Sequence, residues 1–482
     1  MIFSRSRRLV LTLGLLLAAA TSSFAQSDRQ RFERQMDQIR QQTLELAPTD
    51  VPVDQRAFID YGAYFLLDYL SVDDSHHDNH VLRQYSFVPY VRLNLDNAQE
   101  VFVRGRLAYR DFNDQDSFDG RGDEFLDPDA DRAYYRFDLA RYREAYSGKK
   151  APYNLVLQGG RDFNFWGNGL VLGQVLDGFN AVASVGPLSL ALVAGVTPTR
   201  TVDFDASRPT FDHNTRRGFY GGLVTLEVGQ HRPYAYGIVQ RDYNDQDVST
   251  FGTITTHYQY DSYYIGLGST GALTDKLQYG VECVYQGGET QSNSFRVEPP
   301  FLVGVPQTKD NIEAWAADAR LDYVFNNPAR SRVSAEFLIA SGDSDRLSSS
   351  NTFGGNRPGT TDRGFNGFGL LNTGLAFAPE ASNLLALRLG ASTFPLEQFH
   401  ATRQLQTGFD FFIYGKTDRN APINEQTFDQ RYLGVEPDLF INWQITSDIT
   451  LAARYGVFFP SSKAFPLDDA RQFLLLSVTF AY

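Results

Sequence analysis

The sequence predicts an all-β protein, a transmembrane antiparallel up-and-down β-barrel of about 18 strands with short periplasmic turns and long extracellular loops. Three observations predict it. The chain ends in an alternating strand with a terminal aromatic residue, it begins with a secretory signal, and its strands are joined by alternating short and long connections. The chain also holds 26 Tyr, 38 Phe and 40 Gly, and a lipid-facing barrel wall needs only every second residue to be apolar.

The last ten residues form the most informative strand. One face carries Leu474, Leu476, Val478, Phe480 and Tyr482, because side chains alternate with period two along a strand. The other face is mostly smaller or weakly polar. A strand that ends the chain on an aromatic residue is typical of the closing strand of an outer-membrane barrel. An ordinary strand of a soluble sandwich is the alternative.

Residues 1–25 have the features of a secretory signal peptide. Arg5, Arg7 and Arg8 precede an apolar run, and Ala25 ends a small-x-small cleavage site. The apolar run is too short to span a membrane as a helix. Cleavage removes these three arginines and changes the formal charge from −13 to −16.

Residues 26–56 differ from the rest of the chain. Phe32, Met36, Ile39 and Leu46 recur near the helical period, with charged and amide residues between them. Pro48 and Pro52 follow and end the pattern. We expect a periplasmic N-terminal segment that holds a short helix, and a disordered tail is the alternative.

Residues 57–482 are expected to form one barrel domain. Positions 277–285 illustrate the strands: Leu, Tyr, Val, Cys and Tyr at odd positions alternate with Gln, Gly, Glu and Val. One face can meet lipid and the other holds polar groups. A soluble sandwich gives the same alternation, so the connections must decide between the two folds.

The connections alternate between tight and long. Tight turns are expected at 96–99, 186–187, 229–232, 326–330 and 446–448, and long polar stretches at 113–131, 197–217, 288–310, 342–382 and 415–430. This asymmetry is typical of outer-membrane barrels, which have an even number of strands. Nineteen segments qualify as strands. We therefore assign 368–378 to a long external loop, which leaves 18 strands around an aqueous channel.

Composition and motifs exclude several functions. The single cysteine, Cys283, cannot form an internal disulfide or a cysteine-based zinc cluster, and we interpret it as an inert wall residue. An acidic chain lacks the basic patches of a nucleic-acid-binding protein. We find no serine-lipase elbow, P-loop or zincin signature, so we expect no catalytic residues, no cofactor and no metal.

Three segments resemble the alginate-export family of outer-membrane porins. Leu157–Asp162, followed by Trp166, resembles the family's strand that ends in a Gly-Arg turn, although Asp162 replaces the usual Gln. Tyr432–Asp438 resembles its Gly-x-Glu-x-Asp strand, interrupted here by Pro437. Gly456–Pro460 and the closing strand resemble its last hairpin. The resemblance implies substrate-binding roles for Arg161, Asp162, Glu436 and Asp438.

The alternation itself assigns arginines to the lumen, since a charge on the lipid face at mid-membrane costs about 2–4 kcal/mol. The candidate substrate-binding arginines are Arg92, Arg104, Arg106, Arg110, Arg136, Arg320, Arg388 and Arg454. Guanidinium groups bind carboxylates through two hydrogen bonds. Arg104, Arg106 and Arg110 lie closest together and are the constriction candidates. The alternative is that lumen arginines simply pair with lumen carboxylates.

Two polar stretches raise the question of metal binding. Asp127, Asp129 and Asp131 have the spacing that opens a calcium loop, but Arg132 stands where its glycine belongs. A solvated acidic loop at 111–131 is therefore expected. His76, His77 and His80 lie among aspartates in the first outer loop, where an exposed polar loop is the ordinary interpretation.

The leading hypothesis is an outer-membrane channel for export or diffusion of an anionic polysaccharide or oligosaccharide such as an alginate-like polyuronate. Its expected partners are outer-membrane lipid, the polysaccharide and periplasmic export machinery, and the barrel is expected to be a monomer. A general or small-solute porin is the first alternative. An outer-membrane or secreted carbohydrate-active β-protein is the second, and a hydrolysis assay would identify it.

Overall fold

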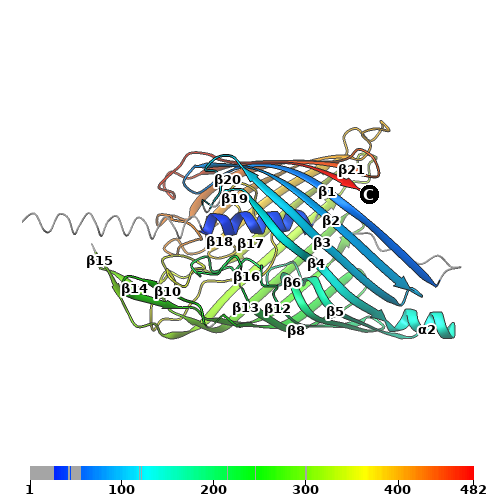
Figure 1. Cartoon of the computed structure of the whole chain (residues 1–482), viewed down its shortest axis with the longest axis horizontal. Coiled ribbons are helices and arrows are strands. Elements are labelled where there is room, and N and C mark those ends of the chain that lie inside the picture. The colour runs from blue at the N-terminus through cyan, green and yellow to red at the C-terminus, as the bar shows by residue number, and fades with distance from the viewer. Residues whose placement is uncertain are drawn as a thin grey trace, which may run out of the picture.

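Eighteen antiparallel strands form one closed sheet in the computed structural model (Figure 1). The structure describes residues 26–41, 44, 56–118, 120, 122–213, 215–244, 246–298 and 301–482. The signal peptide expected at 1–25 lies outside these residues. The expected barrel, its strand number and its antiparallel order are confirmed.

The barrel strands are β1 (Ala57–Asp73), β2 (Asn79–Leu95), β3 (Gln99–Phe112), β4 (Glu124–Asp138), β5 (Tyr153–Phe165), β6 (Gly173–Val185), β7 (Leu188–Val196), β8 (Arg217–Leu226), β9 (His231–Asp242), β12 (Tyr260–Thr274), β13 (Leu277–Gln291), β16 (Lys309–Val324), β17 (Arg332–Ala340), β18 (Leu384–Thr393), β19 (Leu405–Lys416), β20 (Tyr432–Gln444), β21 (Ile449–Pro460) and β22 (Arg471–Ala481). Two short hairpins, β10 (Val248–Phe251) with β11 (Ile254–His257) and β14 (Phe295–Glu298) with β15 (Phe301–Gly304), rise from the loops.

The closing strand β22 joins the two ends of the sheet. It pairs with β21 on one side and with β1 on the other, where Tyr64 lies opposite Ala481. The backbone of Tyr482 exchanges two hydrogen bonds of 2.9 Å with Ala63. No strand edge is left open at this seam, which is how a barrel satisfies its backbone within a membrane.

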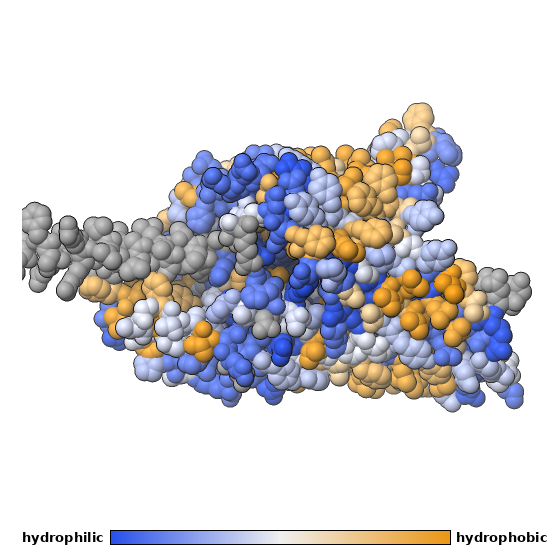
Figure 2. Space-filling view, in the orientation of Figure 1, coloured by the Kyte–Doolittle hydropathy of each residue, from blue (hydrophilic) through white to orange (hydrophobic). Residues whose placement is uncertain are grey.

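The predicted register of β22 is confirmed. Leu476 and Phe480 are 45% and 39% exposed on the outer face, whereas Leu475, Ser477 and Thr479 are buried on the inner one. Cys283 is exposed on β13 between exposed Val281 and Tyr285, so it is a residue of the outer wall. Figure 2 shows apolar residues over much of the wall, with hydrophilic residues across the middle of the face in view.

The described residues include two helices. Residues 26–41 form an N-terminal helix, and α2 (Leu139–Ser147) lies at the end of the barrel that carries the short turns. The Asp138 side chain caps α2 by accepting a hydrogen bond from the Arg141 N–H, and Gly148 ends it with φ 63°. Neither helix has the length and apolarity needed to cross a membrane.

The acidic stretch expected as a solvated loop at 111–131 is a loop only between β3 and β4, at 113–123, and the prediction was wrong for residues 124–131. β4 begins at Glu124, so Asp127, Asp129 and Asp131 lie on a strand. β4 pairs with β5 only from Ala133 to Asp138. Beyond that, each of these three carboxylates forms an ion pair with an arginine, so the calcium-loop arrangement is absent from this segment.

Candidate functional site, the channel lumen

The N-terminal helix lies inside the barrel (Figure 1). Its first turns contact the extracellular loops: Ser27 donates a hydrogen bond to the Asn424 carbonyl (3.1 Å), and Asp28 accepts one from Ser75 (2.8 Å). Its last turn reaches Arg132 of β4, which donates to Gln41 (2.8 Å). The periplasmic position expected for residues 26–41 is therefore wrong. Its polar side chains are instead paired by groups that line the lumen.

The most specific contact of the helix is with a predicted constriction residue. Arg110 of β3 donates two hydrogen bonds to the two carboxylate oxygens of Glu33, at 2.7 and 2.9 Å. The same guanidinium also donates to Glu124 (2.9 Å) and Gln84 (3.0 Å), and it lies 5.2 Å from the ring centre of Phe32. Every nitrogen of the Arg110 guanidinium therefore donates a hydrogen bond.

Every guanidinium nitrogen of Arg104 donates as well, and the side chain is completely buried. It donates three hydrogen bonds of 2.7–3.0 Å to Asp131 and a fourth, of 2.6 Å, to the Leu44 carbonyl. Arg106, the third constriction candidate, borders the cavity described below. The three arginines do lie on the lumen side of β3, as predicted, but two of them hold the interior together.

The long segment between β17 and β18, residues 341–383, folds into the lumen and not outward as expected. It forms no strand, as predicted for 368–378. Glu436 of β20 anchors it by accepting hydrogen bonds from three successive backbone N–H groups, those of Leu375 (2.6 Å), Ala376 (2.6 Å) and Phe377 (2.9 Å). The Phe377 ring stacks on Phe458 at 4.2 Å.

A second segment, residues 166–172, turns inward between β5 and β6. It meets the long segment edge to edge: the Phe368 N–H donates to Val171 (3.0 Å) and the Gly173 N–H to Phe368 (2.9 Å). Asn168 contacts the opposite wall, where its backbone N–H donates to Glu282 and its side chain to Asp318 (2.7 Å). The two segments therefore cross the lumen and narrow it.

Arg161 and Asp162, the residues supported by the Gly-Arg resemblance, are paired within the wall. Arg161 binds Asp177 (2.5 Å) and Asp129 (2.7 Å). Asp162 accepts a hydrogen bond from Gln158 (2.7 Å) and lies 3.6 Å from Arg132. Asp438 is buried beside Glu436 on β20.

The remaining predicted arginines line the inner wall closer to the periplasmic end. Arg388 pairs with Glu336 (2.5 Å), Arg320 with Asp322 (2.8 Å), and Arg92 lies 3.9 Å from Asp60. Arg454 lies opposite Phe440 on β20, and Arg136 is exposed opposite Glu100 on β3. Three of these five arginines are thus paired with carboxylates of the wall.

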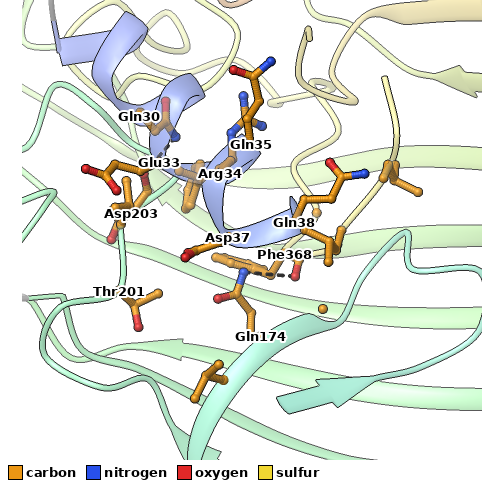
Figure 3. A pocket seen from close by; sticks show the side chains of 18 of the residues that line it. Gln30, Glu33, Arg34, Gln35, Asp37, Gln38, Gln174, Thr201, Asp203 and Phe368 are labelled. Carbon is orange, nitrogen blue, oxygen red and sulfur yellow. Dashed lines mark hydrogen bonds between the residues drawn. The ribbon is translucent and has the colours of Figure 1, made fainter. Parts of the chain in front are cut away.

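A cavity of about 230 Å³ remains between the N-terminal helix and the wall (Figure 3). Glu33, Arg34 and Asp37 of the helix face it across from Gln174 and Thr201. Its other charged borders include Arg40, Arg106, Asp129, Arg161 and Arg200. Such a lining can bind carboxylates and hydroxyls through hydrogen bonds.

An ion network holds the loop between β7 and β8. Asp203 is buried and binds both Arg217 (2.9 Å) and Arg208 (3.2 Å). Asp242 binds the same two arginines at 3.3 and 3.1 Å. Burial alone would raise the pKa of Asp203, but the charges of Arg217 and Arg208 outweigh it and lower that pKa below its ordinary value.

The histidine-rich outer loop lies at the first turn of the helix. The ligand atoms of Asp28, Asp74 and His76 all lie within 4.8 Å of one another. Asp74 also accepts hydrogen bonds from the backbone N–H groups of His76 (2.8 Å) and Asp78 (2.9 Å). Arg31 lies 3.3 Å from Asp28 and supplies a positive charge there. The loop therefore fastens the helix through polar contacts.

Sequence reasoning missed Glu33, Arg34 and Gln35 of the helix, and also Glu282 of β13. The helical spacing of Phe32, Met36 and Ile39 was visible, but nothing in that spacing shows what the helix packs against. The alternation did place Glu282 on an inner face; its partners, Tyr234 and Tyr236, lie 48 and 46 residues away.

Comparison with known proteins decides the family. The sequence model described as alginate export matches residues 68–462. The chain belongs to the alginate-export family. No curated protein sequence matches it.

Solved porin structures share the fold at low identity. Pseudomonas aeruginosa OccK8 (OprE) is 10% identical with a TM-score of 0.52, covering 88% of this chain and 98% of that one. Pseudomonas aeruginosa OpdO is 11% identical with a TM-score of 0.50, covering 88% and 97%. Acinetobacter baumannii OccAB1 is 11% identical with a TM-score of 0.50, covering 88% and 96%. These structures share the barrel fold. Membership of the alginate-export family, with the closed barrel and its apolar outer face, makes this protein an outer-membrane channel barrel.

Proposed function

We propose that the protein passes an anionic polysaccharide or oligosaccharide, such as an alginate-like polyuronate, across the outer membrane without chemical change. Membership of the alginate-export family supports the polymer class. The observation that carries the proposal is the series of lumen arginines, whose guanidinium groups already bind carboxylates at 2.5–2.7 Å along the channel.

Exchange of carboxylates makes such sites weak, as a channel requires. Arg161 already binds the carboxylates of Asp129 and Asp177. A uronate carboxylate would therefore take the place of one of these aspartate carboxylates, which is a group of the same kind. The net free-energy change of that exchange is small compared with binding to an unpaired buried charge. Sites that bind too tightly do not release their cargo. Arg106 and Arg161 border the cavity, and we propose them as the first sites a polymer meets there.

A planar-bilayer recording tests this function. An oligouronate should block the ionic current of the purified protein more strongly than a neutral oligosaccharide of equal length. The Arg106→Ser variant should be blocked less, and Arg106→Lys should restore the block only in part, because lysine lacks the planar fork. Arg143→Ser on α2, outside the lumen, is the matched control.

Two results would contradict the proposal. Equal block by charged and neutral sugars would identify a general porin, the first alternative. Shortened oligouronate after incubation with the protein, detected by chromatography, would identify a carbohydrate-active protein, the second alternative.

A further inference from the structure

We propose that the N-terminal helix, residues 26–41, is a removable plug that closes the channel when it is seated. Its purpose rests on the proposed function, because a polymer could not pass while the helix is in place. Its test needs only ionic current and no substrate. The helix has 16 residues and is therefore about 24 Å long, comparable to the thickness of a bilayer core.

The helix is held from several sides of the lumen. Gln30 donates to the Asp203 carbonyl (2.8 Å) in the loop after β7, and Arg31 to the Phe377 carbonyl (3.3 Å) in the inward segment. Glu33 binds Arg110 on β3, as described. Together with the inward segments 166–172 and 341–383, the helix therefore obstructs the channel.

The helix is held more weakly than the inward segment 341–383. Phe32 is its one fully buried apolar side chain, whereas Met36 and Ile39 are only partly buried. The inward segment instead buries Phe365, Phe368 and Phe377. The helix is fastened mainly by hydrogen bonds and ion pairs, which water can replace. Elements with few buried apolar contacts open at the lowest free energy.

The two wall arginines that contact this N-terminal segment keep carboxylate partners when the helix leaves. Arg110 keeps Glu124 and Gln84, and Arg104 keeps its three hydrogen bonds to Asp131. Neither arginine would be left without a counter-charge, so the large penalty for an uncompensated buried charge does not fall on them. The ion pairs that do break are those of Arg34 with Glu380 (3.7 Å) and of Arg29 with Asp212 (3.3 Å). Departure of Glu33 frees one bidentate fork on Arg110, the geometry that a uronate carboxylate takes.

The base of the plug has an apolar anchor. Leu44 is 2% exposed and packs with Leu66 of β1 and Val88 of β2. The Leu44 carbonyl also accepts the hydrogen bond from Arg104, so Leu44 is held by both an apolar and a polar contact. We therefore expect the helix to leave its seat while Leu44 stays in place.

A reversible cross-link tests the plug on the full chain. Asp28→Cys and Ser75→Cys are introduced in a Cys283→Ser background. In the parent the Ser75 Oγ lies 2.8 Å from the Asp28 Oδ2. The oxidised protein should conduct little in a bilayer, and reduction on the same membrane should raise the current. Asp37→Cys with Ser75→Cys is the control, because Asp37 lies nine residues further along the helix and should not cross-link.

A charge substitution provides an independent measurement. Glu33→Lys should shift the ratio of closed to open time about tenfold toward open, the effect of removing about 1.4 kcal/mol of interaction. Glu227→Lys makes the same charge change outside the lumen, in the turn after β8, where Glu227 pairs with exposed Arg232. It should leave the ratio near that of the parent. Heat-modifiable gel mobility checks that each variant is folded.

The outcomes separate the plug from the proposed function. If oxidised, reduced and Glu33→Lys proteins all conduct equally, the plug is overturned while block by oligouronate can still support the channel. If none of them conducts, both the plug and the channel are overturned. If the current rises on reduction and with Glu33→Lys but oligouronate does not block it, the plug is supported and the proposed substrate class is refuted.

Discussion

A single carboxylate holds the inward segment 341–383 in the lumen. Glu436 is completely buried, and its three backbone donors all belong to one turn of the inward segment. The Tyr414 hydroxyl adds a fourth hydrogen bond at 3.3 Å. Charge-assisted bonds to a buried carboxylate are stronger than neutral ones. Glu436 therefore acts as the attachment point of residues 375–377.

Replacing Glu436 by Gln should release this turn. The amide offers one acceptor oxygen in place of two, so buried N–H groups lose their partner at a cost of about 1–3 kcal/mol. We expect a larger and noisier single-channel conductance. Asp322→Asn is the matched control, because Asp322 lies on the lumen wall and pairs with Arg320 and Arg332. Equal conductance of Glu436→Gln and the parent would refute the attachment role.

At the scale of elements, the loops fall into two kinds. Most turns at the periplasmic end are short, the connections that follow β4 and β18 being longer. The long loop after β7, at the other end, is held against the barrel by buried ion pairs. The loop after β7 is held by Asp203, Arg208 and Arg217, each at most 2% exposed. Removing one partner from such a buried network leaves an uncompensated charge.

The β7–β8 loop should respond to acid through Asp203. A carboxylate with a lowered pKa in the folded state contributes stability at pH values above its ordinary pKa, and this contribution is lost as the pH falls through the lowered value. Hydrogen exchange of residues 197–213 should therefore be slower in the parent than in Asp203→Asn at pH 7. The difference should shrink below about pH 4.

The comparison with the variant isolates Asp203. Burial raises the pKa of neighbouring Asp205, so protonation of Asp205 acts in the opposite direction, and it is common to both proteins. A difference between parent and Asp203→Asn that persists unchanged to pH 2 would show that the ion network does not hold the loop.

At the scale of the whole molecule, an apolar outer wall surrounds a polar interior. Ile265 and Leu267 on β12 are 54% and 61% exposed. Tyr264, which precedes Ile265 on the same strand, is 1% exposed and donates a hydrogen bond to the Asn366 carbonyl inside the barrel. This inversion is stable only in lipid, because in water the wall would expose apolar surface around the full barrel.

An arginine on the wall should therefore be costly only where the wall meets lipid. Ile265→Arg should lower the free energy of unfolding by about 2–4 kcal/mol, measured in urea with lipid vesicles. Val248→Arg is the matched control: Val248 is 43% exposed but lies on β10, outside the barrel sheet. Equal destabilisation by both changes would mean that this face of β12 does not meet lipid.

The alternation of apolar and polar residues was enough to predict the barrel, because each strand encodes its own two faces and lipid requires one of them to be apolar. The closing strand and the register of β22 follow from that local pattern, and the even number of strands in outer-membrane barrels reduced nineteen candidates to 18. The lumen position of Arg104 and Arg110 follows from it as well. These features depend on residues two positions apart.

Only the tertiary structure decided what fills the channel. Glu33 and Arg110 are 77 residues apart, Arg31 and Phe377 are 346 apart, and Glu436 lies about 60 residues from the turn it holds. No periodic pattern links such partners. A polar helix has the same sequence signature in the periplasm and in an aqueous lumen, since both surround it with water and charge. The sequence by itself therefore determined the wall, and long-range pairing of charges determined the interior.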